Sequence, residues 1–435
     1  MTPRLLIAAA SSGCGKTTFT MGLLRAWHRK GLNVQPFKCG PDYIDTQFHA
    51  VASGTSSVNL DVWLSSEQHV RQQFNRYSSG ADACVVEGVM GLFDGYDRMQ
   101  GSAAHIARLL DLPVVLLVNA KSAAYSVAPL IYGFRHFDNR VRLVGVVFNQ
   151  VASASHYRFL QEACADAGVE CFGYIPKCPG MEVPSRHLGL ALENRDVMNA
   201  WIDQAADLVS QHVDLERLAS ACGVESKHTE IQSHTAYSRL AALFGTDGFR
   251  HIAVASDEAF NFTYRANLSV LEHMGKVEYF SPIRDHALPE SVDFVYLPGG
   301  YPELYARQLS ENHSMLQSIR DYAGKGGHLL AECGGMIYLS ESLIDADGTV
   351  HPLAGVLPVR ATMQGAKLHL GYRRMVLEGE EWFGHEFHYS HIENPDALKS
   401  ITTLYAAKGN AVDTALYRIK NTIAGYTHWY WGDEA

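Results

Sequence analysis

A short segment near the N-terminus, AAASSGCGKTT at residues 8–18, combines glycines, a lysine and threonines in the manner of a phosphate-binding loop. Glycines let the backbone curl close to an anion, the lysine can reach the outer phosphates of a nucleotide, and the first threonine hydroxyl can ligate Mg²⁺. Ala10 stands where the usual pattern has its first glycine, so the alternative is a small-residue turn between a strand and a helix. We favour the loop, and assign to ATP and Mg²⁺ the residues Gly13, Gly15, Lys16, Thr17 and Thr18.

Carboxylates gather in two other segments, KCGPDYID (38–45) and VEGVMGLFDG (86–95), each of which follows an apolar run. Chemistry on ATP needs hard oxygen ligands for Mg²⁺ and a group to be phosphorylated or activated. Turn-forming Asp and Gly explain either segment alone equally well, but two such segments at one sheet edge favour a functional site. The side chains concerned are Lys38, Asp42, Tyr43, Asp45, Glu87 and Asp94.

A second kind of chemistry is indicated by GHLLAECGGMIYL (327–339), which places Cys333 between a predicted strand and a predicted helix. This is the setting of a nucleophile elbow, where the turn exposes the sulfur and the next N–H groups, beginning with Gly334, face a developing oxyanion. The upstream segment LPGGYPE (297–303) offers a second oxyanion donor at Gly300 or Tyr301. The other seven cysteines are expected to be small buried apolar residues.

A cysteine nucleophile needs a base, and the chain has 21 histidines to choose from. The segment HEFHYSH (385–391) is dense in histidine, and its spacing is also compatible with a metal site. The segment GYTHWYW (425–431) offers His428, 95 residues after Cys333. Composition and spacing leave this choice open.

The elements that must position these groups alternate in type along the first half of the chain. Apolar, β-branched runs of strand length are separated by helical stretches such as 16–29 and 101–110. Continuous apolar strands that alternate with helices predict a parallel sheet covered on both faces. The predicted strands are 4–10, 33–38, 83–89, 113–120 and 141–150.

A second alternation follows a polar stretch at about 212–250 and predicts a second α/β domain. Its predicted strands are 251–257, 276–282, 294–300 and 327–332. We therefore predict an ATP-binding domain at 1–220, a linker at 221–249 and a cysteine-containing domain at 250–435.

Bulk properties are those of a water-soluble globular protein. The 435 residues are 47% hydrophobic and 19% charged, and no apolar run approaches the length of about 20 residues that a membrane helix needs. A net charge of −10 argues against nucleic acid as a partner, because phosphate backbones are held by basic surfaces. The eight cysteines lack zinc-like spacing, so we expect a reduced, cytoplasmic protein.

Five segments in this order, SSGCGKTT, FKCGPDYID, VEGVMGLFDG, PVVLLVNA and VPSRHLGL (183–190), resemble the family of cobyrinic acid a,c-diamide synthases. The resemblance covers nearly the whole chain. It implies an N-terminal domain like the dethiobiotin-synthetase group of phosphate-loop proteins, in which the loop often lacks its first glycine. It also implies that the second domain is like a class I glutamine amidotransferase.

The resemblance assigns further roles along the chain. Glu87 becomes a metal ligand beside Thr17 and Asp45, Asn149 matches a position that contacts adenine, and His428 matches the late histidine of the amidotransferases. Their usual acid two residues later is replaced by Tyr430, so a Cys–His dyad or an acid from elsewhere is implied. Residues that match positions for substrate orientation, phosphorylation or carboxylate binding are Asp42, Tyr43, Ile44, Asp45, Asp94, Arg186 and His187.

The activity implied is ATP- and glutamine-dependent amidation of the a and c carboxylates of cobyrinic acid in cobalamin biosynthesis, through an acyl phosphate and ammonia from glutamine. Partners would be the tetrapyrrole, L-glutamine and ATP, with no nucleic acid or membrane, and a homo-oligomer is compatible. Alternatives are the same chemistry on hydrogenobyrinic acid or nickel-sirohydrochlorin. A non-catalytic phosphate-loop regulatory ATPase is a further alternative, against which an intact Cys333 and His428 argue.

Overall fold

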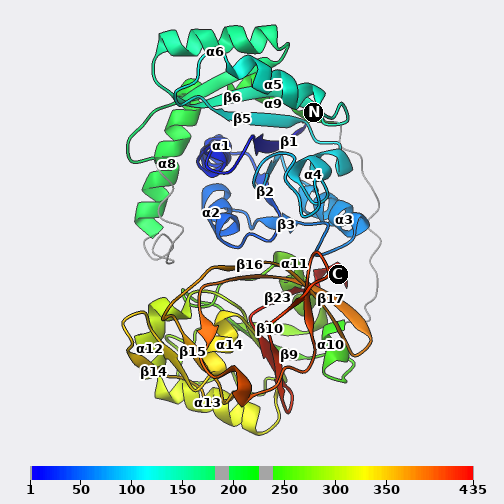
Figure 1. The fold of residues 1–435 in the computed structure, drawn as a ribbon, viewed down its shortest axis with the longest axis vertical. Helices are drawn as coiled ribbons and strands as arrows, with labels where there is room; N and C mark the ends of the chain where they lie inside the picture. The colour runs from blue at the N-terminus through cyan, green and yellow to red at the C-terminus, as the bar shows by residue number, and fades with distance from the viewer. Residues whose placement is uncertain (1, 182–194, 225–238, 435) are drawn as a thin grey trace. The chain divides into compact units, whose positions relative to one another are not determined.

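The computed structural model describes residues 2–181, 195–224 and 239–434 (Figure 1). The chain divides into two compact units, Met1–Gln232 and Ser233–Ala435. This division falls inside the predicted linker of 221–249, and parts of that stretch belong to the units themselves. Residues Gly223–Val224 form strand β8, and Arg239–Leu243 form helix α10, whose Leu240 is buried in a core of the second unit.

The N-terminal unit is built on one sheet with the strand order β3-β2-β4-β1-β5-β6-β7. These seven strands are parallel, as their continuous apolar runs predict, and β8 pairs antiparallel with β1. The strands are β1 (Thr2–Ala9), β2 (Val34–Cys39), β3 (Val58–Leu60), β4 (Ala83–Glu87), β5 (Val114–Asn119), β6 (Leu143–Val151), β7 (Glu170–Pro176) and β8 (Gly223–Val224).

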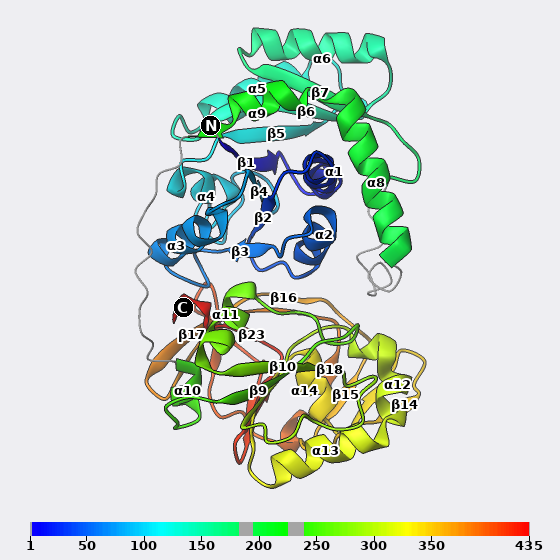
Figure 2. The same ribbon diagram turned by 180° about the vertical axis from the view of Figure 1, so that it is seen from behind.

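Helices cover both faces of this sheet (Figures 1 and 2). Alternate residues of β1 enter two separate cores, Leu6 with the helices of one face and Leu5 with those of the other. On the Leu6 side lie α3 (Glu67–Ser78), α4 (Ala103–Leu109), α5 (Val127–His136) and α6 (Ala154–Asp166). On the Leu5 side lie α1 (Lys16–Arg29), α2 (Ile44–Ser53), α8 (Arg195–His212) and α9 (Leu215–Ala221).

Close contact between α1 and α8 is visible in Figure 2 and depends on a missing side chain. A Cβ atom at Gly22 of α1 would lie 2.6 Å from the carbonyl oxygen of Ala205 in α8. The tight packing fixes α1, and with it the loop that precedes α1, against the rest of the unit.

The C-terminal unit is built on a six-stranded sheet with the order β10-β9-β11-β12-β22-β21, in which β21 alone is antiparallel to its neighbour. Its strands are β9 (His251–Ala255), β10 (Lys276–Phe280), β11 (Phe294–Leu297), β12 (His328–Glu332), β21 (Leu416–Ile419) and β22 (Thr422–Gly425). The helices are α10 (Arg239–Leu243), α11 (Arg265–Met274), α12 (Ala306–Glu311), α13 (His313–Gly324) and α14 (Gly334–Leu339), with short 3₁₀ turns η1 (Pro302–Tyr305), η2 (Pro395–Ala397) and η3 (Gly432–Glu434).

Two smaller sheets complete this unit, with the orders β14-β13-β15-β18 and β20-β19-β16-β17-β23. The second of them carries residues 385–388 of the histidine-rich segment on β17 and His428 on β23, whereas His391 begins β18 of the first. Their strands are β13 (Ser342–Ile344), β14 (Val350–Pro352), β15 (Arg360–Thr362), β16 (His369–Leu377), β17 (Glu380–His388), β18 (His391–Ile392), β19 (Leu404–Ala406), β20 (Ala411–Val412) and β23 (His428–Tyr430).

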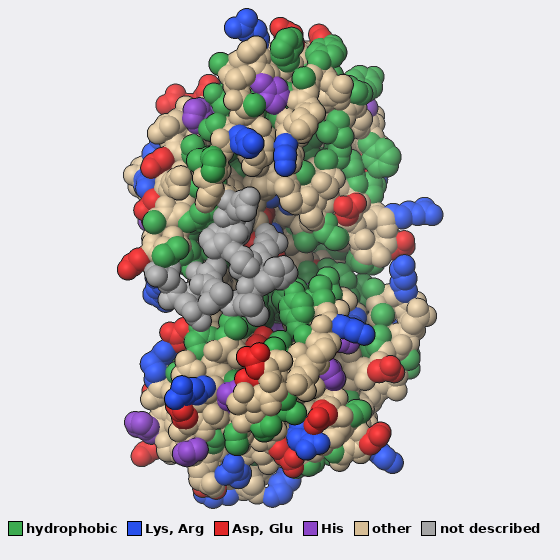
Figure 3. All heavy atoms as spheres, turned by 60° about the vertical axis from the view of Figure 1, so that its left-hand side comes forward, with side chains coloured by type: hydrophobic (Ala, Val, Ile, Leu, Met, Phe, Trp, Pro, Cys, Tyr) green, Lys and Arg blue, Asp and Glu red, His purple; other side chains and the backbone are tan. Residues whose placement is uncertain are grey.

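On the face drawn in Figure 3, acidic and basic side chains lie interspersed. Within the described ranges, no helix has both the length and the apolar character needed to cross a bilayer.

Candidate active sites

The predicted phosphate loop joins β1 to α1, as a nucleotide site of this kind requires. Gly13 and Gly15 have φ values of +77° and +93°, which side-chain-bearing residues rarely adopt. A Cβ atom at Gly15 would also lie 2.1 Å from Nδ2 of Asn149, which donates a 2.9 Å hydrogen bond to the carbonyl of Cys14. The loop is therefore held from the end of β6 by Asn149, a residue that we had predicted at the adenine position.

Lys16 lies folded over this loop. Its Nζ donates to the carbonyl oxygens of Met90, at 2.6 Å, and of Ser11, at 3.3 Å. Burial lowers the pKa of Lys16, while the carboxylate of Glu87 acts in the opposite direction. An ammonium group held only by carbonyls can exchange them for phosphate oxygens, which bind it more strongly.

Beside the loop, four elements bring a buried charged cluster together, consisting of Thr17, Lys38, Asp45, His49 and Glu87. The Lys38 ammonium lies 2.6 Å from Oδ2 of Asp45 and 3.0 Å from Oε1 of Glu87. The Thr17 hydroxyl lies within hydrogen-bonding distance of the same two carboxylates, 3.4 Å from Asp45 and 3.0 Å from Glu87. Every member of the cluster is at most 5% exposed, so these charges interact with little screening by solvent.

The charges in the cluster depend on one another. Burial by itself would lower the pKa of Lys38, but the carboxylates of Asp45 and Glu87 outweigh that effect and raise it. Burial would likewise raise the pKa of Glu87, yet Lys38 and the hydrogen bond from His49 lower it well below its ordinary value. Lys38 is thus a cation and Glu87 an anion at neutral pH.

These residues fit a Mg²⁺ ion that is shared with a nucleotide. Magnesium in phosphate-transfer sites is typically held by one or two carboxylates or a hydroxyl, with phosphate and water completing its shell. Thr17, Asp45 and Glu87 supply one hydroxyl and two carboxylates around a single point. No group of three His, Cys, Asp or Glu side chains that could hold a metal by itself occurs in the described part of the chain.

The other predicted residues of this unit that the structure describes lie around the cluster or in its flanking loops. Asp42 accepts hydrogen bonds from the backbone N–H groups of Ile44, at 2.9 Å, and Asp45, at 2.8 Å, and so fixes the start of α2. Asp94 accepts from the N–H of Gly91 in the loop after β4. Tyr43 is buried immediately before α2, and Thr18 lies in the first turn of α1. Arg186 and His187 lie outside the described residues.

Two members of the cluster are not among the site residues assigned from sequence. Lys38 is part of the quoted acidic segment, but a lysine among carboxylates was not given a role. His49 lies outside the quoted segments. Its Nε2 is 2.8 Å from Oε2 of Glu87, and its Nδ1 is 2.9 Å from the Ser57 hydroxyl. Its position four residues after Asp45 on α2 was the available signal, because residues i and i+4 share a helix face.

In the C-terminal unit, Cys333 stands at the turn between β12 and α14 with φ +46°, a strained value for a cysteine. Its N–H donates to the carbonyl of Gly425 at 2.7 Å, and its Sγ lies 3.9 Å from the carbonyl oxygen of Phe387. The geometry is that of a nucleophile elbow. Burial, and then the carboxylate of Glu303, raise the pKa of the Cys333 thiol well above its ordinary value, so a base must remove its proton.

The glycine-rich turn after β11 approaches both this elbow and His428. A Cβ atom at Gly334 would lie 3.0 Å from the backbone nitrogen of Gly300, and one at Gly299 would lie 2.0 Å from Cε1 of His428. Tyr301, the other predicted donor, is buried next to this turn. The structure thus brings together Cys333, His428 and the predicted oxyanion donors.

His428 lies at the start of β23, where it pairs across the sheet with His385 of β17. Burial, followed by the neighbouring His385 and His388, lowers the pKa of His428 to about 3. The imidazole is therefore neutral near pH 7. Because burial disfavours the imidazolium, His428 takes up a proton only where a neighbouring negative charge stabilises that cation. In the histidine-rich segment, His388 is stacked between the rings of His369 and Tyr426, at centroid distances of 4.9 Å and 3.8 Å, which is a packing arrangement.

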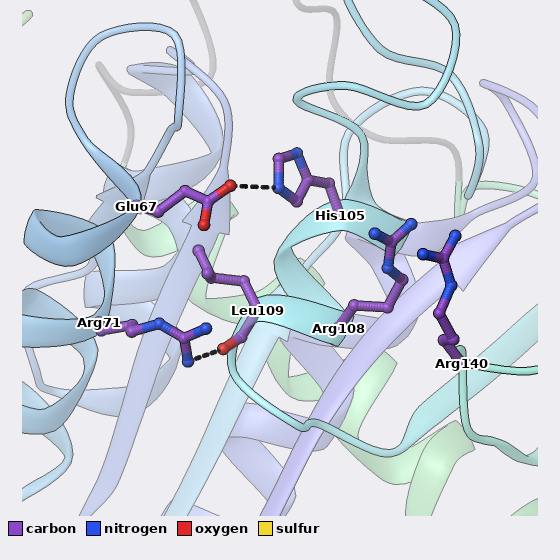
Figure 4. Close-up of a pocket in the computed structure, with 6 residues that line it drawn as sticks. All are labelled: Glu67, Arg71, His105, Arg108, Leu109 and Arg140. Carbon is purple, nitrogen blue, oxygen red and sulfur yellow. Dashed lines mark hydrogen bonds and ion pairs between the residues drawn. The ribbon is translucent and has the colours of Figure 1, made fainter.

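A separate groove lies between α3 and α4 (Figure 4). Its basic side chains already have partners, because Arg71 donates to the carbonyl of Leu109, His105 pairs with Glu67, and Arg108 and Arg140 pair with Asp138. The groove is lined by Glu67, Arg71, His105, Arg108, Leu109 and Arg140. It is a salt-bridged surface hollow that includes none of the residues predicted to do chemistry.

Known proteins match both units of the chain. Residues 5–190 match the CobQ/CobB/MinD/ParA nucleotide binding domain, and residues 251–435 match the CobB/CobQ-like glutamine amidotransferase domain. The hydrogenobyrinate a,c-diamide synthase of Brucella anthropi is 38% identical over 97% of this chain and 97% of its own length. The cobyrinate a,c-diamide synthase of Salmonella typhimurium is 38% identical over 97% of this chain and 94% of its own. Among solved structures, the signal recognition particle 54 kDa protein of Aeropyrum pernix K1 is 17% identical, with a TM-score of 0.32 over 51% of this chain and 50% of that one.

The fold and the two sites define a class of enzyme in which one chain joins a nucleotide-binding domain to a glutamine amidotransferase domain. Within that class, the chain belongs to the family of cobyrinate and hydrogenobyrinate a,c-diamide synthases. The resemblance that the five sequence segments indicated is confirmed. So is the predicted fold class, a phosphate-loop parallel-sheet domain followed by an amidotransferase domain.

Proposed function

We propose that the chain amidates the a and c carboxylates of cobyrinic acid, with ATP as the activating substrate and glutamine as the source of ammonia. The observation that carries this proposal is the presence in one chain of the buried Thr17–Lys38–Asp45–Glu87 cluster beside a phosphate loop and of a cysteine elbow beside a neutral histidine. A lone ATPase or a lone glutaminase would need only one of them. Relatives named for this reaction align with nearly the whole chain.

At the cysteine site, we assign Cys333 as the nucleophile. His428 takes the thiol proton, Sγ bonds to the amide carbon of glutamine, and the carbonyl oxygen becomes an oxyanion that the N–H groups of Gly334 and of Gly300 or Tyr301 stabilise. His428 then gives its proton to the departing nitrogen, the C–N bond breaks, and ammonia leaves. Water hydrolyses the γ-glutamyl thioester to glutamate and restores the thiol.

At the nucleotide site, we assign Gly13, Gly15, Lys16, Thr17 and Thr18 to the phosphates and Asn149 to the adenine end. An oxygen of the substrate carboxylate attacks the γ-phosphorus of ATP, the bond to the bridging oxygen breaks, and ADP leaves. Ammonia then attacks the carbonyl carbon of the acyl phosphate, loses a proton, and displaces inorganic phosphate to form the amide. Lys16 balances the charge that develops during phosphoryl transfer.

The acidic cluster would serve this transfer in two ways. Mg²⁺ would be held by Thr17, Asp45 and Glu87, where it would neutralise phosphate charge. Lys38 and His49 hold those carboxylates in place, at 2.6 Å and 2.8 Å respectively. We assign Tyr43, Ile44, Arg186 and His187 to binding the tetrapyrrole carboxylates. Asp42, Asp45 and Asp94 are assigned to the catalytic set that orients the carboxylate and supports its phosphorylation. Because ATP is its substrate, we place the enzyme in the cytoplasm.

A substrate comparison tests the proposal. The full chain is incubated with glutamine and ATP and, in parallel, with cobyrinic acid, hydrogenobyrinic acid or nickel-sirohydrochlorin, and the amides formed are counted by mass. We expect two carboxylates of cobyrinic acid to become amides, with ATP consumed only when a tetrapyrrole is present. Diamidation of only one of the other rings would reassign the substrate, and ATP turnover without any tetrapyrrole would favour a regulatory ATPase.

A further inference from the structure

The cysteine site lacks an acid at the place where the sequence pattern of these amidotransferases has one. Tyr430 stands two residues after His428, is buried, and packs edge to face against Tyr264. A tyrosine at this position cannot supply a carboxylate to hold the imidazole. Two buried carboxylates in the same unit, Glu332 and Glu386, are candidates for that role.

Glu332 is the last residue of β12 and directly precedes Cys333. Its Oε2 lies 4.0 Å from Nδ1 of His428, and both side chains are 1% exposed. This separation is longer than a hydrogen bond, but catalytic contacts often tighten only when substrate is bound. Because Glu332 and Cys333 are neighbours on one strand end, the backbone that strains the nucleophile also fixes the carboxylate.

Both oxygens of Glu332 are held by other donors. Oε1 accepts a 2.9 Å hydrogen bond from the N–H of Trp429, the residue after His428, and Oε2 accepts a 2.7 Å bond from the Tyr296 hydroxyl. Burial raises the pKa of Glu332 to about 8, whereas these two donors favour the ionised form. The carboxylate is thereby tied to the same strand, β23, that carries the imidazole.

Glu386 is engaged elsewhere. Its Oε2 lies 2.7 Å from the guanidinium of Arg373, and its Oε1 accepts a 3.0 Å hydrogen bond from the Thr427 hydroxyl. Burial would raise the pKa of Glu386, but His388 and Arg373 lower it to about 2. Its charge is therefore balanced by a buried arginine, and the structure assigns it a packing role.

We propose that Glu332 is the positioning acid of the glutaminase site, acting on Nδ1 of His428. The proposal rests on the glutaminase function proposed above. The Glu332 carboxylate keeps the proton of the neutral imidazole on Nδ1, so that Nε2 is the nitrogen that takes the Cys333 proton and later gives it to the leaving ammonia. The imidazolium that forms between these steps favours the ionised form of Glu332, and the carboxylate in turn stabilises that cation.

The test compares Glu332→Gln with Glu386→Gln, which removes the other buried carboxylate. In Glu332→Gln an amide N–H would face Nδ1 and favour the tautomer whose Nε2 already carries a proton, a change that elsewhere lowers kcat by about 10⁴-fold. The assays are kcat and KM for glutamine hydrolysis, amidation with ammonium salt, and thermal unfolding. We expect Glu332→Gln to lower the glutaminase kcat at least about 100-fold, with KM for glutamine, ammonium-dependent amidation and unfolding temperature close to wild type.

Glu386→Gln is expected to keep a kcat near that of the wild type. A normal glutaminase kcat in Glu332→Gln, or an equal loss in Glu386→Gln with the fold intact, would overturn the proposal. If Glu332→Gln does not fold, Glu332→Asp takes its place, because aspartate keeps the charge but moves it away from His428. Glu332→Asp should lower the glutaminase kcat with KM unchanged. An unchanged kcat in Glu332→Asp would contradict the role of Glu332. Absence of glutaminase activity in the wild type would instead contradict the proposed function itself.

Discussion

Two lysines in the N-terminal unit have ammonium groups with different kinds of partner. Lys16 is bonded to two backbone carbonyls, whereas Lys38 lies between two buried carboxylates. Removing the first leaves only solvatable carbonyl groups behind, while removing the second leaves buried anions without a partner. The consequences of substitution should differ accordingly.

Lys16→Ala should leave the fold intact and abolish amidation. The γ-phosphoryl group would lose the ammonium group that balances its charge. Loss of one group that stabilises a transition state typically lowers turnover by about 100-fold or more. Glutamine hydrolysis at Cys333 should survive at least in part. Product formation is measured with both glutamine and ammonium, and near-normal amidation by the variant would contradict the nucleotide assignment.

Lys38→Met should be destabilising in itself. Removing one partner of a buried ion pair typically costs about 3–5 kcal/mol, because Asp45 and Glu87 would repel each other without a cation. Urea unfolding of the full chain, with Lys16→Ala as the matched lysine control, measures the effect. Equal stability of the two variants would mean that the cluster does not depend on Lys38.

At the scale of elements, the turn from β1 to α1 depends on glycine at Gly15. Gly15→Ala would combine a φ of +93° with a Cβ atom 2.1 Å from Nδ2 of Asn149, so the Asn149–Cys14 contact must break. We expect the affinity for ATP, measured by calorimetry, to fall at least tenfold. A tenfold change corresponds to a loss of about 1.4 kcal/mol of binding free energy. Gly31→Ala is the matched control, since Gly31 has a similar φ of +81° and open space around it; a comparable loss in both variants would point to general strain.

Elements with a strong local pattern were predictable, and those made by distant pairing were not. The apolar runs of β1, β4, β5 and β6 indicated a parallel sheet, because strands buried on both faces read as continuous hydrophobic stretches. The two-residue strand β8 has no such signal and exists only because it pairs with β1. The predicted linker at 221–249 therefore contains β8, which belongs to the N-terminal unit, and α10, which belongs to the C-terminal unit.

The candidate sites show the same limit. Gly-Lys-Thr at residues 15–17 and the elbow at Cys333 are local motifs, so their chemistry could be predicted from sequence. The approach of Glu332 to His428 joins residues nearly a hundred positions apart, and it follows from the placement of β12 and β23. The position two residues after His428 holds Tyr430, and no local motif links His428 to Glu332.

At the scale of the whole molecule, the chain carries two chemistries in two units, each with its own core. Ammonia is the one reactant that both chemistries share. Cys333 should then serve only to supply ammonia, and the N-terminal unit should accept ammonia from any source. This division of labour is the central claim.

The most direct test is the amide product formed per ATP consumed by Cys333→Ala, with glutamine and with a high concentration of ammonium salt. His428→Ala and Tyr430→Phe provide the comparison. His428→Ala should also lose amidation with glutamine, because burial raises the pKa of the Cys333 thiol and a base must remove its proton, whereas Tyr430→Phe should change little. We predict that Cys333→Ala forms no amide with glutamine and forms it at the wild-type ratio to ATP with ammonium. A folded, ATP-competent Cys333→Ala that fails with ammonium would contradict the account.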